Sequence, residues 1–164
     1  MAGHDSKQSE RDARDDFIAA MRGVANSVTI VTTDGPAGRR GATVSAFASV
    51  SADPPMVLVC LHGMSTIAKL VQENGVFCVN VLPEGASELA IRFSGATETP
   101  WDGQDYDDTS APRLPGATTF LARVASVTTQ GSHVIVFGEV FESHASGTLP
   151  LIYADGRFLG EDET

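Results

Sequence analysis

Short apolar runs separated by turn-forming residues recur along the chain, and most have the length and composition of strands. Strands are expected at 27–33, 42–51, 56–62, 76–82, 118–129 and 132–144, with a last one near 150–153 that turns at Ala154-Asp155-Gly156 into 157–159. Apolar residues at helical spacing predict short helices at about 14–25, 65–73 and 84–93. Six or seven strands joined mainly by turns predict a mainly β fold with short helices, as a closed antiparallel barrel.

The order of these elements disfavours a doubly wound parallel sheet. Strands and helices do not alternate regularly, and no glycine-rich turn follows the first strand, so a Rossmann-type dinucleotide site is not expected. Residues 1–14 are polar and carry charges of both signs, which predicts a disordered tail. Residues 15–164 are expected to form one domain, and this length supports a full-sized core.

Composition and charge narrow the class of protein. The chain has 42% hydrophobic and 20% charged residues, as in an ordinary soluble domain, and its formal net charge is −10. This acidity argues against nucleic acid, whose phosphates select basic surfaces. No apolar run approaches the roughly 20 residues of a membrane helix, and the polar N-terminus is unlike a secretory signal. We therefore expect a cytoplasmic protein that binds no membrane.

The two cysteines, Cys60 and Cys78, lie inside the apolar runs VLVCLHG and GVFCVNVL. They are interpreted as buried, reduced side chains rather than as a disulfide or as metal ligands. The sequence contains no CxxC or HExxH motif and no clustered carboxylates, so no metal site is predicted.

The expected strand at 42–51 lacks the bulky side chains of a core strand. Alternation places hydroxyls and one aromatic ring on one of its faces, namely Thr43, Ser45, Phe47, Ser49 and Ser51. Buried hydroxyls need partners, so such a face suits either a flat, acceptor-rich heteroaromatic ligand or open solvent. The pattern alone does not separate these two interpretations.

Two further stretches carry groups suited to a ligand. Ser65 and Thr66 open the helix expected at 65–73, where free amides favour an anion such as phosphate, although simple N-capping also accounts for Ser65. His133 follows a turn glycine at the head of a strand, a position typical of a barrel rim. An imidazole there is either a site residue near neutral pH or merely a structural or exposed one.

The order and spacing of several motifs carry a resemblance to a known family. They are FIAAMRGVANSVTIVTT, GATVSAFASVSADPP, LVCL with a following ST, NGVFCVNVL, ELAIRFSG, GSHVIVFGEV, and PLIY followed by DGRF. Together they resemble the flavin reductase-like family, the small reductase components of two-component flavin-dependent monooxygenases. The resemblance runs from about Phe17 to Phe158.

The resemblance implies a six- to seven-stranded antiparallel split β-barrel of Greek-key, FMN-binding type, a homodimer, and a flavin site. The residues that match the family's flavin-binding positions are Thr43, Val44, Ser45, Ser49, Val50, Ser51, Ser65, Thr66, Asn80, Val81, Leu82, Arg92 and Phe93. His133 matches the histidine beside the nicotinamide site, and Tyr153 is expected near the same mouth. The missing bulk in 42–51 is then room for a cofactor.

One departure concerns the histidine. Many members have Gly-Asp-His where this chain has Gly131-Ser132-His133. A serine cannot supply the charge with which an aspartate would orient or charge the imidazole. In this chain the role implied for His133, positioning the nicotinamide, would have to be fulfilled without that charge.

The activity implied by the resemblance is that of an NAD(P)H:flavin oxidoreductase. It would reduce FMN or FAD with NADH or NADPH and supply the reduced flavin to a partner monooxygenase. The alternatives are a reductase that retains FMN and passes electrons to another acceptor such as a corrinoid, a non-catalytic flavin- or haem-binding protein, and a pyridoxamine phosphate oxidase-like enzyme. The polar segment 94–115, with Trp101 at its centre, is expected to be a lid or a dimer contact.

Overall fold

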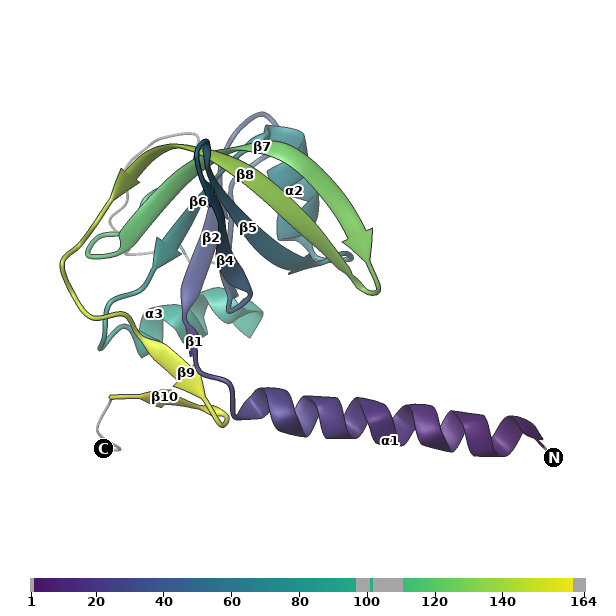
Figure 1. The fold of residues 1–164 in the computed structure, drawn as a ribbon. Helices are drawn as coiled ribbons and strands as arrows, with labels where there is room; N and C mark the ends of the chain where they lie inside the picture. The colour runs from purple at the N-terminus through teal and green to yellow at the C-terminus, as the bar shows by residue number, and fades with distance from the viewer. Residues whose placement is uncertain (1, 97–100, 102–110, 161–164) are drawn as a thin grey trace.

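The computed structural model describes residues 2–96, 101 and 111–160, and its main element is a curved, seven-stranded antiparallel sheet (Figure 1). Its strand order is β3-β2-β6-β7-β8-β5-β4. In chain order the strands are β2 (Thr29–Thr33), β3 (Arg40–Val44), β4 (Phe47–Ala52), β5 (Pro55–His62), β6 (Val76–Val81), β7 (Thr118–Gln130) and β8 (His133–His144). The predicted mainly β, antiparallel fold is confirmed.

A second, three-stranded sheet lies below the first in Figure 1. It consists of β1 (Asn26–Ser27), β9 (Ile152–Ala154) and β10 (Arg157–Leu159). The strand expected at 27–33 is thus divided at Val28, whose amide donates to the carbonyl of Leu151 at 2.9 Å. This division sends one chain segment into both sheets, so the hairpin of β9 and β10 is fixed close to the main sheet.

The single strand expected over 42–51 is wrong. The structure bends the chain at Ser45 and Ala46 and divides the segment into β3 and β4, at opposite edges of the sheet. The amide of Phe47 donates to the carbonyl of Ser45 at 3.1 Å, and the amide of Cys60 donates to that of Ala46 at 2.9 Å. Since β3 and β4 do not pair with each other, these strands form a split barrel and not a closed one.

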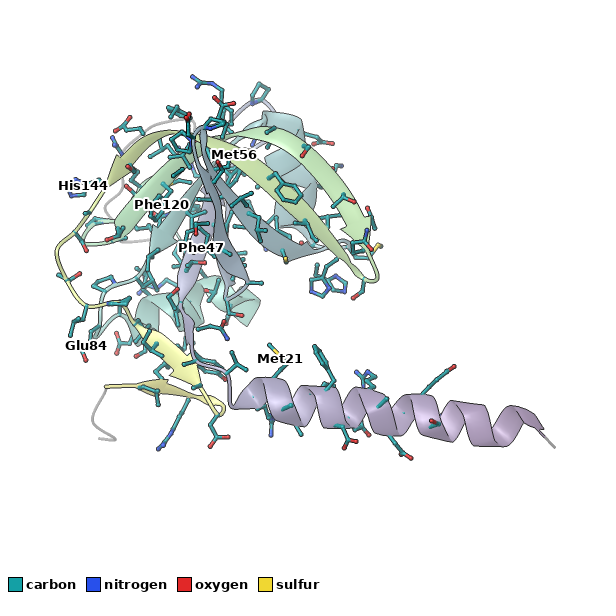
Figure 2. The ribbon with its side chains drawn as sticks, viewed as in Figure 1. Met21, Phe47, Met56, Glu84, Phe120 and His144 are labelled. Carbon is teal, nitrogen blue, oxygen red and sulfur yellow. The ribbon has the colours of Figure 1, made fainter. Side chains whose placement is uncertain are left out.

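The hydrophobic core fills the inside of the curved sheet. Phe47 and Phe120 approach there with ring centroids 5.6 Å apart (Figure 2), and Phe77 is fully buried. Helix α2 (Thr66–Asn74) covers one end of the core with Ile67, Ala68 and Val71. Each large apolar side chain buried in this way stabilises the fold by about 1.5–3 kcal/mol.

The helix predicted at 65–73 is confirmed, with both ends one residue later, at Thr66 and Asn74. The hydroxyl of Ser65 accepts a hydrogen bond from the amide of Ala68 at 3.3 Å, which caps the N-terminus of α2. Gly75 ends the helix with a φ of 73°, the left-handed conformation that glycine adopts without a Cβ clash.

The helix expected over 84–93 is shorter and changes character. α3 spans Ser87–Ile91, and a π-type turn, η1 (Arg92–Ala96), follows and contains Gly95, whose φ is 96°. A π-type turn changes the direction in which the following side chains point, compared with a continuing α-helix. Here the turn buries Phe93 while Arg92 stays half-exposed.

The N-terminal segment differs from the disordered tail expected over 1–14. α1 spans Ala2–Arg22, a 21-residue helix that extends away from both sheets (Figure 1). Glu10, Arg11, Ala13 and Arg14 are strong helix formers, and their polarity prevents burial but not helix formation. In the described part of the chain, no helix is long and apolar enough to cross a membrane.

Candidate active site along strand β3

A row of adjoining cavities follows β3 between α2, α3, β5 and the hairpin of β9 and β10. Thr43 and Ser45 each line three of these cavities, whose volumes lie between about 190 and 390 Å³. Because neighbouring cavities share residues, a ligand that lies along β3 would extend from one into the next. Sites for cofactors and small molecules have this size and shape.

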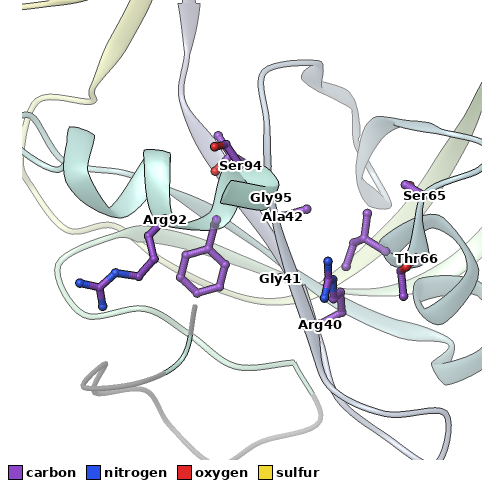
Figure 3. A pocket seen from close by; sticks show the side chains of 11 residues that line it. Arg40, Gly41, Ala42, Ser65, Thr66, Arg92, Ser94 and Gly95 are labelled. Atoms are coloured by element: carbon purple, nitrogen blue, oxygen red, sulfur yellow. The ribbon is translucent and has the colours of Figure 1, made fainter. Parts of the chain in front are cut away.

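The lining of one end of the row includes two arginines and two hydroxyl side chains from the start of α2. Arg40, Arg92, Ser65 and Thr66 come from β3, η1 and the start of α2 (Figure 3). In Figure 3 the Arg40 side chain lies on the same side of the view as Ser65 and Thr66, whereas the Arg92 side chain points to the opposite side. Cations together with the free amides of a helix N-terminus favour an anion such as a phosphate group.

Ser65 both caps the N-terminus of α2 and lines the site. Its hydroxyl donates to the carbonyl of His62 at 2.6 Å and accepts from the amide of Ala68 at 3.3 Å. Both bonds hold the turn before α2 in place, while Ser65 still lines two of the cavities. Thr66, the first residue of α2, is exposed. The start of α2 is therefore a rigid wall of the site.

A central cavity of about 290 Å³ lies between β3 and β5. Its lining contains no Lys, Arg, Asp or Glu side chain among the residues that the structure describes. Most of it is small or apolar: Ala42, Thr43, Val44, Ser45, Ala46, Cys60, Leu61, Ser65 and Ile67. Two imidazoles, from His62 and His133, complete it. An uncharged wall of small side chains suits a flat ring system better than a phosphate.

His133 lies at the rim of this cavity, as its position in the sequence predicts. It is exposed and begins β8, directly opposite His62 on β5. The hydroxyl of Ser132 lies 3.0 Å from Nδ1 of His133. The serine that replaces the family's aspartate therefore contacts the imidazole and orients it by a hydrogen bond, without adding a charge.

Tyr153 occupies the opposite side of Ser45. It lines two cavities of about 390 and 330 Å³, and its ring packs against Phe158 with centroids 5.2 Å apart. Met21 and Arg22, at the end of α1, line the second of these cavities. The aromatic pair thus forms the outer mouth of the row, beside the N-terminal helix.

Several residues that match the family's flavin positions do not line these cavities. Ser49, Val50 and Ser51 lie on β4, at the other edge of the sheet from β3. Leu82 is fully buried in a core cluster with Val28 and Phe93. The bend at Ser45 and Ala46 is the physical reason for the first group, because it separates β4 from the hydroxyls of β3.

Asn80 is built into the core of the described structure. It is fully buried, and its side-chain amide donates to the carbonyl of Ile30 at 3.0 Å and to Thr32 Oγ1 at 3.1 Å. Its Oδ1 accepts from the amide of Leu114 at 2.7 Å. Asn80 thus ties β2, β6 and the segment before β7 together, and its neighbour Val81 is half-buried. The structure does not bring Asn80 to the cavities.

Trp101 packs within its own chain. Its ring meets that of Phe93 edge-on at 5.0 Å, and the Arg39 guanidinium lies 5.8 Å from its ring centroid. The lid or dimer contact expected over 94–115 falls mostly outside the described residues. Within them, no group of three or more His, Cys, Asp or Glu side chains is arranged to hold a metal ion.

Sequence reasoning considered Arg40 only as a candidate for a nucleotide 2′-phosphate and left His62 ambiguous, so it placed neither residue in the flavin site. Arg40 stands among other charged residues of the turn 34–41, where a solvent-exposed role is the ordinary expectation. His62 ends an apolar strand, and only the pairing of β5 with β8 places it opposite His133. Such cross-strand neighbours are set by register, which short-range pattern does not reveal.

Comparison with known proteins identifies the family of this chain. Residues 21–161 match the flavin reductase like domain. FMN reductase (NADH) RutF of Ancylobacter novellus is 41% identical over 152 residues, which cover 89% of this chain and 84% of that protein. The chain therefore belongs to the flavin reductase-like family.

Solved structures share the fold. Nitrilotriacetate monooxygenase component B from Mycobacterium thermoresistibile superposes with a TM-score of 0.84 and 28% identity, covering 93% of this chain and 89% of that one. NADH:FAD oxidoreductase SgcE6 of Streptomyces globisporus, in complex with NAD and FAD fragments, has a TM-score of 0.83 and 26% identity, with coverages of 92% and 93%. These neighbours are a monooxygenase component and a flavin oxidoreductase.

Proposed function

We propose that this protein is an NADH-dependent flavin reductase that transfers a hydride from the nicotinamide to FMN. The observation that carries the proposal is the row of cavities along β3. It joins a cationic, hydroxyl-rich end at Arg40 and Thr66 to an uncharged central cavity with two imidazoles. This polarity matches a molecule with a phosphate at one end and a flat, uncharged ring system at the other.

The residues present fit FMN. Arg40, Thr66 and the amides at the start of α2 would hold its phosphate, and the small side chains of β3 would lie along the ring. FMN is preferred over FAD because relatives such as that of Ancylobacter novellus are named FMN reductases with NADH as donor. FAD is the alternative to be tested, because the Streptomyces globisporus protein is named an NADH:FAD oxidoreductase.

The two bound nucleotides supply the hydride chemistry themselves, and the protein orients them. The side chains that β3 and the bend give to the central cavity, from Ala42 to Ala46, are all small, which would leave room for a second ring to stack. His133, oriented by Ser132 at 3.0 Å, lies where it would position the nicotinamide. Holding the two rings in reacting geometry is the main rate contribution expected of such a site.

Reduced flavin is proposed to leave the site and reach a separate monooxygenase. The support is the likeness to nitrilotriacetate monooxygenase component B, which is named as part of such a system. The cavities open to the surface at Ser45, Thr66 and His133, which are all exposed or rim residues. Because NADH is a cytoplasmic electron donor, the cytoplasm is the proposed place of action.

A homodimer is proposed to form through α1. Phe17, Ile18 and Met21 are exposed on this helix, as is Val24 just after its end, and 64% of the Phe17 surface is accessible. Amphipathic helices in proteins owe most of their stability to packing of the apolar face. A second copy of the chain would supply that packing.

Light scattering is expected to give a mass near twice the 17.2 kDa of one chain. A Phe17→Asp variant should shift the mass toward the monomer, whereas Asp15→Ser on the same helix should not. A monomeric wild-type protein would refute this assembly.

The proposed activity is tested by following NADH oxidation at 340 nm with FMN, FAD or riboflavin added separately. Turnover that saturates with free FMN, and a higher KM for riboflavin, is the expected result. Tightly retained flavin without turnover of added flavin would favour the reductase with another acceptor. A Soret band in the purified protein would favour a haem-binding protein and overturn the proposal.

A further inference from the structure

We propose that His62 is a second nicotinamide-binding residue, which donates a hydrogen bond from Nε2 to the carboxamide oxygen of NADH. The inference rests on the proposed function and names a contact for the same site. Its starting observation is the pairing of His62 with His133 across β5 and β8. The two rings meet edge-on with centroids 5.5 Å apart, at the rim of the central cavity.

The tautomer of His62 follows from its own hydrogen bond. Its Nδ1 accepts from the amide of Met64 at 3.3 Å. In a neutral imidazole one ring nitrogen accepts and the other carries the proton, so Nε2 of His62 is a donor. Within the described part of the chain this nitrogen makes no hydrogen bond. A donor at a cavity rim is thus left for a ligand.

The backbone around His62 is held from two sides. Its carbonyl accepts from the amide of Ser65 at 2.9 Å and from the Ser65 hydroxyl at 2.6 Å. The amide of the next residue, Gly63, donates to the carbonyl of Ser132 at 2.9 Å. These bonds tie His62 both to the cap of α2 and to the turn that carries His133. The side chain therefore starts from a rigid base, as a positioning contact requires.

The chemistry of the cavity selects the acceptor. The lining contains no cationic side chain in the described residues, and the arginines lie at the other cavity, with the start of α2. A pyrophosphate binds most favourably to such cations, whereas a carboxamide oxygen needs only a neutral N–H donor. His62 consequently faces the nicotinamide end of NADH and not its phosphates.

Two amide substitutions separate the two nitrogens of the ring. In His62→Asn, Oδ1 takes the place of Nδ1 and still accepts from the Met64 amide, but the Nε2 donor is lost. In His62→Gln, the longer side chain returns an N–H donor to the region of Nε2. His144→Asn is the matched control, since His144 is exposed at the opposite end of β8 from His133 (Figure 2).

We expect His62→Asn to raise the KM for NADH about three- to tenfold and to change the KM for FMN much less, because the hydrogen bond that is lost is one to the nicotinamide. His62→Gln should recover most of this loss, and His144→Asn should equal the wild type. An unchanged KM for NADH in His62→Asn, a parallel rise in the KM for FMN, or equal behaviour of Asn and Gln would each overturn the assignment.

A titration of the protein with NADH tests the His62 contact independently of the proposed reductase activity. If wild-type protein shows no turnover with NADH and any flavin, the proposed function fails by that result alone. NADH fluorescence titrations of the wild type and His62→Asn then decide the contact. A weaker dissociation constant for NADH in the variant supports it, and equal constants overturn it.

Discussion

Replacing Arg40 by Gln is expected to weaken FMN binding about tenfold and to leave riboflavin binding unchanged. Arg40 lines the same cavity as Thr66 at the start of α2, where the phosphate is proposed to bind (Figure 3). A hydrogen bond to a charged group contributes about 1.5–3 kcal/mol, and 1.4 kcal/mol corresponds to a factor of ten in affinity. Riboflavin lacks the phosphate, so its affinity should not depend on the charge of Arg40.

Quenching of flavin fluorescence on titration with protein measures both dissociation constants in one experiment. Arg123→Gln removes the same charge from an exposed position on β7 and should change neither constant. Added salt should also weaken FMN more than riboflavin in the wild type, since it screens the charge pair. Equal losses for FMN and riboflavin in Arg40→Gln would show that the phosphate binds elsewhere.

Strand positions were predictable from the sequence because apolar runs and turn residues mark them locally. The runs at 76–82, 118–129 and 132–144 correspond closely to β6, β7 and β8. The N-terminus of α2 was equally clear, because Ser65 supplies the cap that the helix needs. These features depend on residues close to one another in the sequence, and a local sequence pattern contains that information.

The bend between β3 and β4 was not predictable in the same way. Alternation runs unbroken through GATVSAFASVS, and neither glycine nor proline marks Ser45 and Ala46 as a break. What decides the bend is that β3 pairs with β2 while β4 pairs with β5, at opposite edges of the sheet. This is a long-range pairing, and it divides the expected row of hydroxyls between two places.

The residues of the candidate site likewise divide into those that the sequence predicts and those that it does not. Thr43, Ser45 and His133 belong to it because a strand edge and a turn place them there, as expected. Asn80 carries the polarity of a site residue, yet its amide serves the core through Ile30 and Leu114. A buried amide that satisfies backbone groups and one that binds a ligand look alike in a sequence.

Gly41→Ala is expected to weaken both the fold and FMN binding. A Cβ at Gly41 would lie 2.5 Å from Cε1 of Phe93 and 3.2 Å from Cζ2 of Trp101. Phe93 is buried and lines the same cavity as Arg40, so moving its ring disturbs the wall at the phosphate end. Overpacking of this kind costs about 1–3 kcal/mol. We expect a lower Tm together with a several-fold weaker dissociation constant for FMN.

Gly138→Ala separates these two effects. A Cβ there would also lie 2.5 Å from an aromatic carbon, Cζ of Phe77, and 2.8 Å from the Cβ of Ala122. Both neighbours belong to the main core and line none of the cavities along β3. This variant should lose a similar free energy of unfolding, about 2–4 °C in Tm for each kcal/mol, and keep the affinity of the wild type for FMN. If Gly138→Ala weakened FMN binding as much as Gly41→Ala, loss of stability alone would explain both, and the wall formed by Gly41 and Phe93 would have no part in binding.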